Sequence, residues 1–277
     1  MKKRVLFVLI ALTVLLLLIG VLFTVCESNA RMLPGVEKMN IEHLLQKEKL
    51  DDADYGFLLN QTGLGKSAIE DLRTQADGFS ETILAFQNQY HSPAEYQCDF
   101  IFFPTTKEEQ LATNADRIKL PPLRDGDILI TRSTHTLGFR HGHAGIVVDA
   151  SRGKTVESVL LGVKSSVQSV EKWTRYPTLL ILRPKDNMVA QQAASFAKEH
   201  LVGVDYSFLA GLWKKDKQND LPMNSTHCSH LVWQAYHAAG MDIDGDGWLV
   251  LPQDIANCKE LQLVFAYGFD AERRWES

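Results

Sequence analysis

The sequence has too little cysteine for a disulfide framework. Only four of its 277 residues are cysteine. Cys26 falls inside an apolar N-terminal run, which leaves Cys98, Cys228 and Cys258 in the rest of the chain. Outside the cytoplasm an odd number of thiols indicates that one of them stays free. The question for the remaining residues is which thiol that is.

An excess of positive charge is also missing. Without the first 30 residues the chain has 26 basic and 33 acidic side chains, a net charge of −7. An acidic domain gains nothing from counterion release on a polyanion, and no basic stripe interleaved with aromatic residues is present. Nucleic acid is therefore excluded as a partner.

Repeats and low-complexity segments are absent, and the composition is that of an ordinary globular protein, with 45% hydrophobic and 23% charged residues. A near match to a phosphate-binding loop, Gly63-Leu64-Gly65-Lys66-Ser67, has Asn60 where the first glycine is required. Because the cradle of backbone amides needs that glycine, nucleotide binding is not expected.

The first 30 residues read as a membrane segment. Lys2, Lys3 and Arg4 precede an unbroken apolar run from Val5 to Cys26, which is long enough to cross a bilayer and longer than the core of a cleaved signal. The positive cluster predicts a single-pass anchor with its N-terminus in the cytoplasm and the remaining chain outside. The sequence Ser28-Asn29-Ala30 leaves a second interpretation open, cleavage after Ala30 and secretion.

Periodicity divides the rest into a helical lead-in, residues 31–119, and a main domain, residues 120–277. Apolar residues recur at helical spacing from Val36 to Tyr90, which predicts two or three amphipathic helices that serve as a cap over a cleft or as a spacer. Short β-branched and aromatic runs then predict strands of one antiparallel sheet or small barrel over Cys98–Phe103, Asp127–Thr131, Ala144–Val148, Lys154–Val159 and Thr178–Leu182.

Two helices are expected after these strands. Asp186 is a suitable N-cap for Asn187–Val202, which would end at Gly203, and the second helix spans Ser229–Ala239. Strands and helices are thus segregated along the chain. This order indicates an α+β fold rather than an alternating parallel sheet.

Cys228 lies at the predicted start of the second helix, on the same face as the apolar residues Leu231 and Val232. A helix N-terminus favours thiolate and supplies unpaired N–H groups for an oxyanion. The competing interpretation is a small buried hydrophobic residue, the commonest environment of free cysteine.

A histidine and a carboxylate complete a candidate triad. His143 begins a predicted strand on the same face as Gly145, which leaves space beside the imidazole. Glu157 lies on the next strand, and an antiparallel hairpin would bring its carboxylate toward His143. A thiol nucleophile needs such a base, and the base needs a group that orients it.

These segments resemble the circularly permuted NlpC-like papain-fold hydrolases of the YiiX type, in which the histidine precedes the cysteine. The resemblance covers residues 120–256 and is carried by Arg124-Asp125-Gly126-Asp127-Ile128-Leu129, His143-Ala144-Gly145-Ile146-Val147, Thr155-Val156-Glu157-Ser158, Cys228-Ser229-His230-Leu231-Val232 and Leu251-Pro252-Gln253-Asp254-Ile255. It implies a thiol amidase or peptidase with Cys228 as nucleophile, His143 as base and Glu157 as orienting group.

The chain departs from the family pattern beside this triad. His227 stands where the family often has tyrosine and His230 where it has glutamate, changes that bear on the thiol pKa and the substrate pocket. Gly203-Val204-Asp205-Tyr206 is similar to a family segment with its tyrosine and aspartate exchanged. Tyr206 and His227 are accordingly the candidate substrate-binding residues, with a buried packing role as the alternative for Tyr206.

Other chemistry remains open. His141 and His143 point the same way on a strand and, with Cys228 and His227 or His230, form a weak zinc set. Asp242, Asp244 and Asp246 match the opening of a calcium loop, but Gln253 stands where the bidentate glutamate belongs. No other cofactor is expected. With Cys228 free, Cys98 and Cys258 remain as a candidate disulfide.

The sequence therefore predicts an extracytoplasmic, membrane-anchored cysteine hydrolase, an amidase or peptidase that acts on peptide or acyl amides, with cell-wall peptides among the candidate substrates. The alternatives are a catalytically silent domain that binds wall peptide or lipid in the same cleft, and a zinc- or calcium-binding module.

Overall fold

The computed structural model describes residues 2–26, 33–74, 78–92, 94–102, 105–136, 138–211, 221–244 and 249–275. The α-helices are α1 (Lys2–Cys26), α2 (Glu42–Leu45), α3 (Asp52–Thr62), α4 (Lys66–Thr74), α5 (Phe79–His91), α6 (Asn187–His200), α7 (Cys228–Ala238) and α8 (Pro252–Asn257). Two short 3₁₀ helices, η1 (Ala150–Arg152) and η2 (Val170–Arg175), lie between strands.

The strands are β1 (Tyr96–Phe102), β2 (Thr106–Leu111), β3 (Ile128–Thr131), β4 (Thr134–Thr136), β5 (His143–Asp149), β6 (Lys154–Glu157), β7 (Ser166–Ser169), β8 (Leu179–Pro184), β9 (Asp205–Tyr206), β10 (Ser225–Thr226) and β11 (Leu261–Tyr267). Six of them form an antiparallel sheet in the order β11-β8-β3-β5-β6-β7. The α+β prediction is confirmed, and four of the five predicted strands belong to this sheet.

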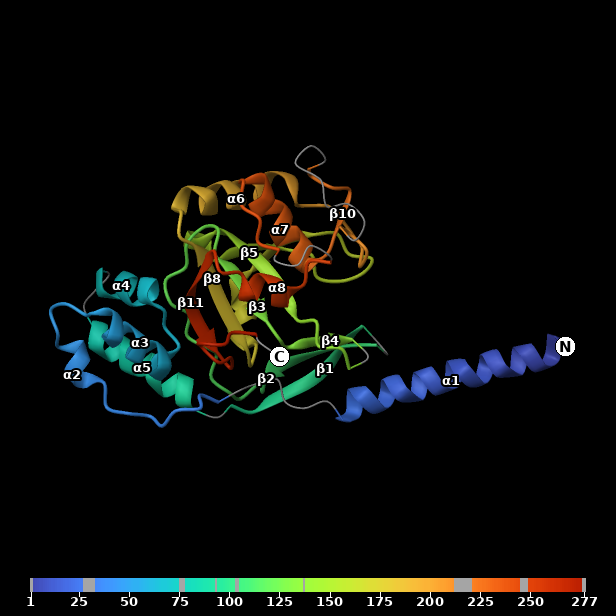
Figure 1. Ribbon diagram of the computed structural model, residues 1–277, viewed down its shortest axis with the longest axis horizontal. Helices are drawn as coiled ribbons and strands as arrows, with labels where there is room; N and C mark the ends of the chain where they lie inside the picture. The colour runs from blue at the N-terminus through green and yellow to red at the C-terminus, as the bar shows by residue number, and fades with distance from the viewer. Residues whose placement is uncertain are drawn as a thin grey trace.

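Helices cover the central sheet (Figure 1), and the alternation of its side chains produces two hydrophobic layers. On one face Ile128, Ile130 and Ile146 pack with residues of α6 and α7. On the other face Leu129 and Val147 pack with residues of α2–α5 and with Trp173 of η2. The predicted helices are present as α6, capped by Asp186 through the amide of Met188, and α7, which begins one residue early at Cys228.

The expectation that Cys98–Phe103 joins the main sheet is wrong. Strand β1 instead pairs with β2, and β2 pairs with β4, so these three form a separate sheet. The partner strand reads Thr-Lys-Glu-Glu-Gln-Leu and has no strand signal in the sequence. Its buried carboxylates are compensated by distant groups, Tyr176 at 2.7 Å for Glu108 and Arg140 at 2.9 Å for Glu109.

The lead-in contains four helices rather than two or three, and it shares a hydrophobic core with the sheet. Leu64, in the turn between α3 and α4, forms a β-bridge with Phe265 of β11. A Cβ on Gly65 would lie only 1.8 Å from the carbonyl oxygen of Leu263. The glycine that resembled part of a phosphate loop thus permits close packing of two backbones.

Helix α1 stands apart from these layers (Figure 1), with its large apolar side chains exposed. Among the described residues it is the one helix long and apolar enough to cross a membrane, over Arg4–Val21. A membrane anchor and a signal sequence both fit this description.

A buried ion pair fixes the loop before β3 to the sheet. Arg183 of β8 donates to both carboxylate oxygens of Asp127, at 2.6 and 2.8 Å, and to Asp71 of α4 at 3.1 Å. The side chains of Arg183 and Asp127 are 1% and 0% exposed. Removing one partner of such a pair leaves the other charge buried and uncompensated.

We therefore expect Arg183→Met to lower the free energy of unfolding by about 3–5 kcal/mol, measured by urea unfolding of the full chain in detergent micelles. The control is Arg152→Met, which removes a pair with Asp149 in which the arginine is 79% exposed; its expected cost is about 0–1 kcal/mol. Equal effects of the two substitutions would contradict the assigned importance of the buried pair.

Candidate active site

Cys228 is the first residue of α7, and its side chain is 8% exposed. The helix follows an N-cap residue, His227, with extended backbone. The first N–H groups of a helix have no acceptor within the helix and carry its positive dipole end. The thiol is therefore positioned where a negative charge is favoured, as the sequence predicts.

His143 is the first residue of β5 and is 5% exposed. Its Nε2 lies 2.8 Å from Glu157 Oε2, which leaves Nδ1 as the nitrogen available to the thiol. The Cys228 thiol lies close enough to this imidazole for each group to shift the pKa of the other toward its charged form. Strand β5 and helix α7 pack against each other, so the structure brings together the three residues of the predicted triad.

Glu157 is fully buried at the end of β6. Besides His143 it has two donors to Oε1, Thr155 Oγ1 at 2.5 Å and Trp173 Nε1 at 2.8 Å. The Trp173 ring also stacks on the His143 imidazole, with centroids 5.4 Å apart and planes 15° apart. These contacts fix the carboxylate and the imidazole relative to each other.

Gly145 is the residue that makes room for this arrangement. A Cβ at this position would lie 2.9 Å from Glu157 Cγ and 3.0 Å from a ring carbon of Trp173. The sequence predicted space beside the imidazole at Gly145. The structure fills that space with the groups that hold the imidazole.

The buried charges of the site stabilise one another. Burial opposes the charged imidazole of His143, but its hydrogen bonds to Cys228 and Glu157 outweigh burial and raise its pKa to about 9. Burial likewise opposes the thiolate, yet contact with the imidazoles of His143 and His227 lowers the pKa of Cys228 well below its usual value. Thiolate and imidazolium therefore coexist from the lowered thiol pKa up to about pH 9.

His227 and His230 flank the thiol at the start of α7. His227 Nδ1 accepts from the His230 backbone N–H at 3.4 Å. The ring of His230 is fully buried, and its Nδ1 lies 3.2 Å from Thr226 Oγ1. Burial first, and then the nearby His227, lowers the pKa of His230 to about 3. His230 is thus a neutral ring beneath the site, whereas His227 borders the cavity.

A cavity of about 350 Å³ opens over the thiol. The described part of its lining is mostly apolar and includes no Asp, Glu, Lys or Arg. It consists of Thr136, Phe139, His141, Tyr206, Phe208, Leu209, His227, Cys228, Ser229, Leu249, Leu251 and Pro252. Both predicted substrate-binding residues, Tyr206 and His227, are among them. Burial and the nearby Cys228 raise the pKa of Tyr206, which keeps its phenol neutral.

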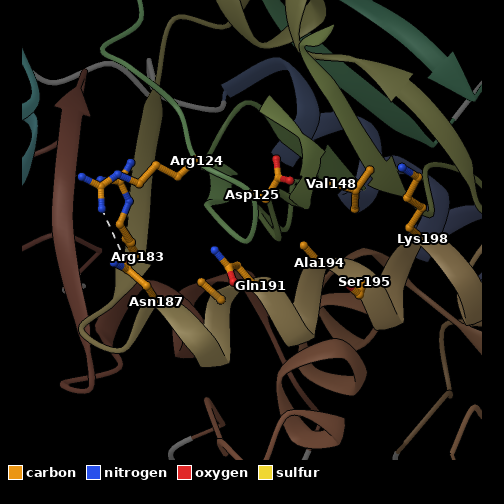
Figure 2. A pocket seen from close by; sticks show the side chains of 10 residues that line it. Arg124, Asp125, Val148, Arg183, Asn187, Gln191, Ala194, Ser195 and Lys198 are labelled. Atoms are coloured by element: carbon orange, nitrogen blue, oxygen red, sulfur yellow. Dashed lines mark hydrogen bonds between the residues drawn. The ribbon is translucent and has the colours of Figure 1, made fainter. Parts of the chain in front are cut away.

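Figure 2 shows a second cavity, of about 600 Å³, along α6 and away from the thiol. Its arginines are already paired: Arg124 donates to Asp71 at 2.5 Å, and Arg183 is held by Asp127 and Asp71. The arginines of this cavity thus belong to ion pairs of the fold, and Cys228, His143 and Glu157 are not among its lining residues.

The geometry gives little support to the zinc and calcium sites considered from the sequence. His141 borders the cavity, but its Nδ1 and Nε2 lie 2.8 and 2.9 Å from Gly142 O and Thr136 Oγ1. Within the described ranges no group of three His, Cys, Asp or Glu side chains is arranged to hold a metal. In the calcium motif, Asp242 Oδ1 accepts from Trp233 Nε1 and from the amide of Asp244, at 3.0 Å each, whereas Asp246 lies outside the described residues.

The candidate disulfide does not form. Cys98 and Cys258 are both free thiols, the first exposed on β1 and the second partly buried after α8. Cys98 Sγ lies 3.5 Å from His135 Nε2 instead. The prediction paired two cysteines by elimination, and the separate sheet that carries Cys98 was not visible in the sequence.

Two contributors to the site were missed from the sequence, Trp173 and the apolar segment Phe208–Leu209. A buried tryptophan needs an acceptor for its N–H, but nothing in the sequence around Trp173 indicates that this acceptor is Glu157. Phe208 and Leu209 are 51% and 65% exposed. The sequence feature that could have indicated this segment is the pair of large apolar residues just after the candidate Tyr206.

No protein-family model, curated protein or solved structure matches this chain in comparisons with known proteins.

The charge arrangement predicts how Cys228 alkylation depends on pH. In the full chain, iodoacetamide should modify Cys228 with a half-maximal rate well below the ordinary thiol pKa of about 8.5. In His143→Ala burial is no longer offset by this imidazole, so the midpoint should move upward. Modification is followed by mass spectrometry of the Cys228 peptide.

The exposed Cys98 provides the internal control, because its rate should be indifferent to His143→Ala. A Cys228 midpoint that stays the same in the variant would contradict the thiolate–imidazolium pair.

Proposed function

We propose that this protein is a cysteine hydrolase, an amidase or peptidase of the permuted papain-like type that cleaves acyl or peptide amide bonds through an acyl-enzyme. The observation that carries the proposal is the burial of Cys228 beside His143, whose Nε2 lies 2.8 Å from Glu157 Oε2. Nucleophile, base and orienting carboxylate occupy the three roles that thiol acyl transfer requires.

In the proposed reaction the thiolate sulfur of Cys228 attacks the substrate carbonyl. The carbonyl π electrons move to oxygen, where the backbone N–H of Cys228 at the start of α7 stabilises the oxyanion. When the C–O double bond re-forms, the bond to the leaving amine breaks and the amine takes the proton of the His143 imidazolium. Water then attacks the thioester carbonyl and gives a proton to His143. When the C–S bond breaks, the acid leaves and the thiolate–imidazolium pair is restored.

The geometry favours an enzyme over a silent binding domain. A domain that only bound ligand would have no need for an imidazolium and a carboxylate buried beside a thiol, because desolvating charges is costly unless they are paired. Here the cost of burying each charge is offset by a neighbour in the triad: His143 for Cys228, Cys228 and Glu157 for His143, and His143 for Glu157.

The cavity supports an apolar acyl group as the part of the substrate next to Cys228. Its polar lining groups are largely engaged within the protein: His141 with Thr136 and Gly142, and Ser229 with the carbonyl of Val250 at 2.8 Å. Phe139, Phe208 and Leu209 are exposed at 51–65% and so are available to an apolar ligand. Tethering through α1 would place this opening near a membrane surface.

Hydrolysis of 4-nitrophenyl acetate by the full chain in detergent micelles tests the proposal. We expect a burst of nitrophenolate equal to the enzyme and an acetyl thioester on the Cys228 peptide. In Cys228→Ser turnover should fall by about 10³-fold or more. Cys98→Ser, which removes the exposed thiol, should retain wild-type rates. Equal activity in Cys228→Ser would contradict the proposal.

The apolar lining predicts a preference for longer acyl chains. Each buried methylene contributes about 0.8 kcal/mol, so kcat/KM should rise about fourfold per carbon from 4-nitrophenyl acetate to the hexanoate. Leu209→Ser should weaken this dependence. The matched control is Met188→Ser on α6, which alters a side chain of similar exposure outside the cavity. Equal rates for all chain lengths would contradict an acyl pocket.

A further inference from the structure

The proton on His227 has a defined position. The residue is the N-cap of α7, and its Nδ1 accepts a hydrogen bond from the backbone N–H of His230. A backbone amide can only donate, so Nδ1 carries no proton and in the neutral ring the proton is on Nε2. Ser229 Oγ, 3.3 Å from the same Nδ1, donates its own proton to the carbonyl of Val250.

Among the described residues the Nε2–H of His227 has no acceptor within hydrogen-bond distance. His227 is 6% exposed, and within the part of the chain that the structure describes its buried Nε2 has no hydrogen-bond partner. His227 and Cys228 line the same cavity, and His227 lies close enough to the thiol to lower its pKa. A buried polar group left unpaired costs free energy, so its placement beside the nucleophile calls for a ligand atom that accepts from it.

We infer that His227 is a catalytic residue whose Nε2–H, together with the backbone N–H of Cys228, donates to the oxyanion formed when Cys228 attacks the substrate carbonyl. The inference rests on the proposed function. It adds a side-chain donor to the oxyanion, for which the proposed reaction names only the backbone N–H of Cys228. No proton leaves His227 in the step: the oxygen gains the carbonyl π electrons, accepts the two hydrogen bonds, and returns the electrons when the leaving group departs.

A purely structural role does not explain the imidazole. An N-cap needs only an acceptor for the first-turn amides, and Asn or Asp serve that purpose at least as well. Histidine adds a second ring nitrogen on a side chain that borders the cavity. His227→Asn therefore separates the two roles, since it retains a capping oxygen for the His230 amide and removes the donor at the cavity.

Two reactions of the same thiol measure the donor. Alkylation by iodoacetamide is a displacement at a CH₂ group and forms no oxyanion, whereas acylation by 4-nitrophenyl acetate passes through one. Both are followed against pH in the full chain in detergent micelles, and the plateau rates above the thiol pKa are compared. In this way a change in the thiol pKa does not enter the comparison.

In His227→Asn we expect the acylation plateau to fall by about 10²–10³-fold, as removal of one oxyanion donor does in other enzymes, while the alkylation plateau stays within about threefold of the wild type. The control is His237→Asn. His237 is in the last turn of α7, stacks on Trp233 with centroids 4.6 Å apart, and also has a buried Nε2 without a partner among the described residues. Both of its plateaus should be unchanged.

An acylation plateau equal to the wild type in His227→Asn would overturn the inference, as would equal losses in both reactions, which indicate a displaced thiol rather than a lost donor. Neither result affects the proposed function. An inert Cys228 in the wild-type chain would instead overturn the proposed function, and this inference with it.

Discussion

The buried carboxylate of Glu157 is the charge on which the rest of the site depends. It is fully removed from solvent, so each oxygen must find donors within the protein. Thr155 and Trp173 satisfy one oxygen, and His143 satisfies the other. The carboxylate stabilises the imidazolium, and the imidazolium stabilises the thiolate. Loss of any donor to the carboxylate would therefore change the stability of the Cys228 thiolate, two groups away.

The distance between the Cys228 thiol and the His143 imidazole is set by packing between layers. Cys228 belongs to a helix and His143 to a strand, and their approach follows from the contact of α7 with β5. That contact is fixed near the other end of the helix, where Tyr236 donates to the carbonyl of Gly126 at 2.5 Å. Gly126 has a positive φ of 92°, and a Cβ there would lie 2.4 Å from the carbonyl oxygen of Ala190. The Asp-Gly turn before β3 thus brings α6 and α7 onto the sheet.

The helices α2–α5 complete the core and leave the cavity open. None of their residues lines the cavity over Cys228. They bury the sheet face that carries Val147, together with Trp173 of η2. The Trp173 side chain contacts both Glu157 and His143. The lead-in therefore packs behind the site, against the sheet face that carries Val147. A cap over the cleft was one of the two roles that the sequence left open for it.

Local patterns in the sequence were sufficient to predict the α+β class, most of the central sheet and the helices α6 and α7, and they indicated Cys228, His143 and Glu157 as a candidate triad. Period-2 alternation, an N-cap aspartate and the position of a cysteine at a helix start are short-range properties. The tertiary structure decided what depends on residues far apart. It placed β1 in a second sheet, kept Cys98 and Cys258 apart, brought Trp173 to Glu157 and placed His227 beside the cavity. Partners separated by many residues are chosen by packing and by the compensation of buried charges, and a single sequence does not reveal these pairings.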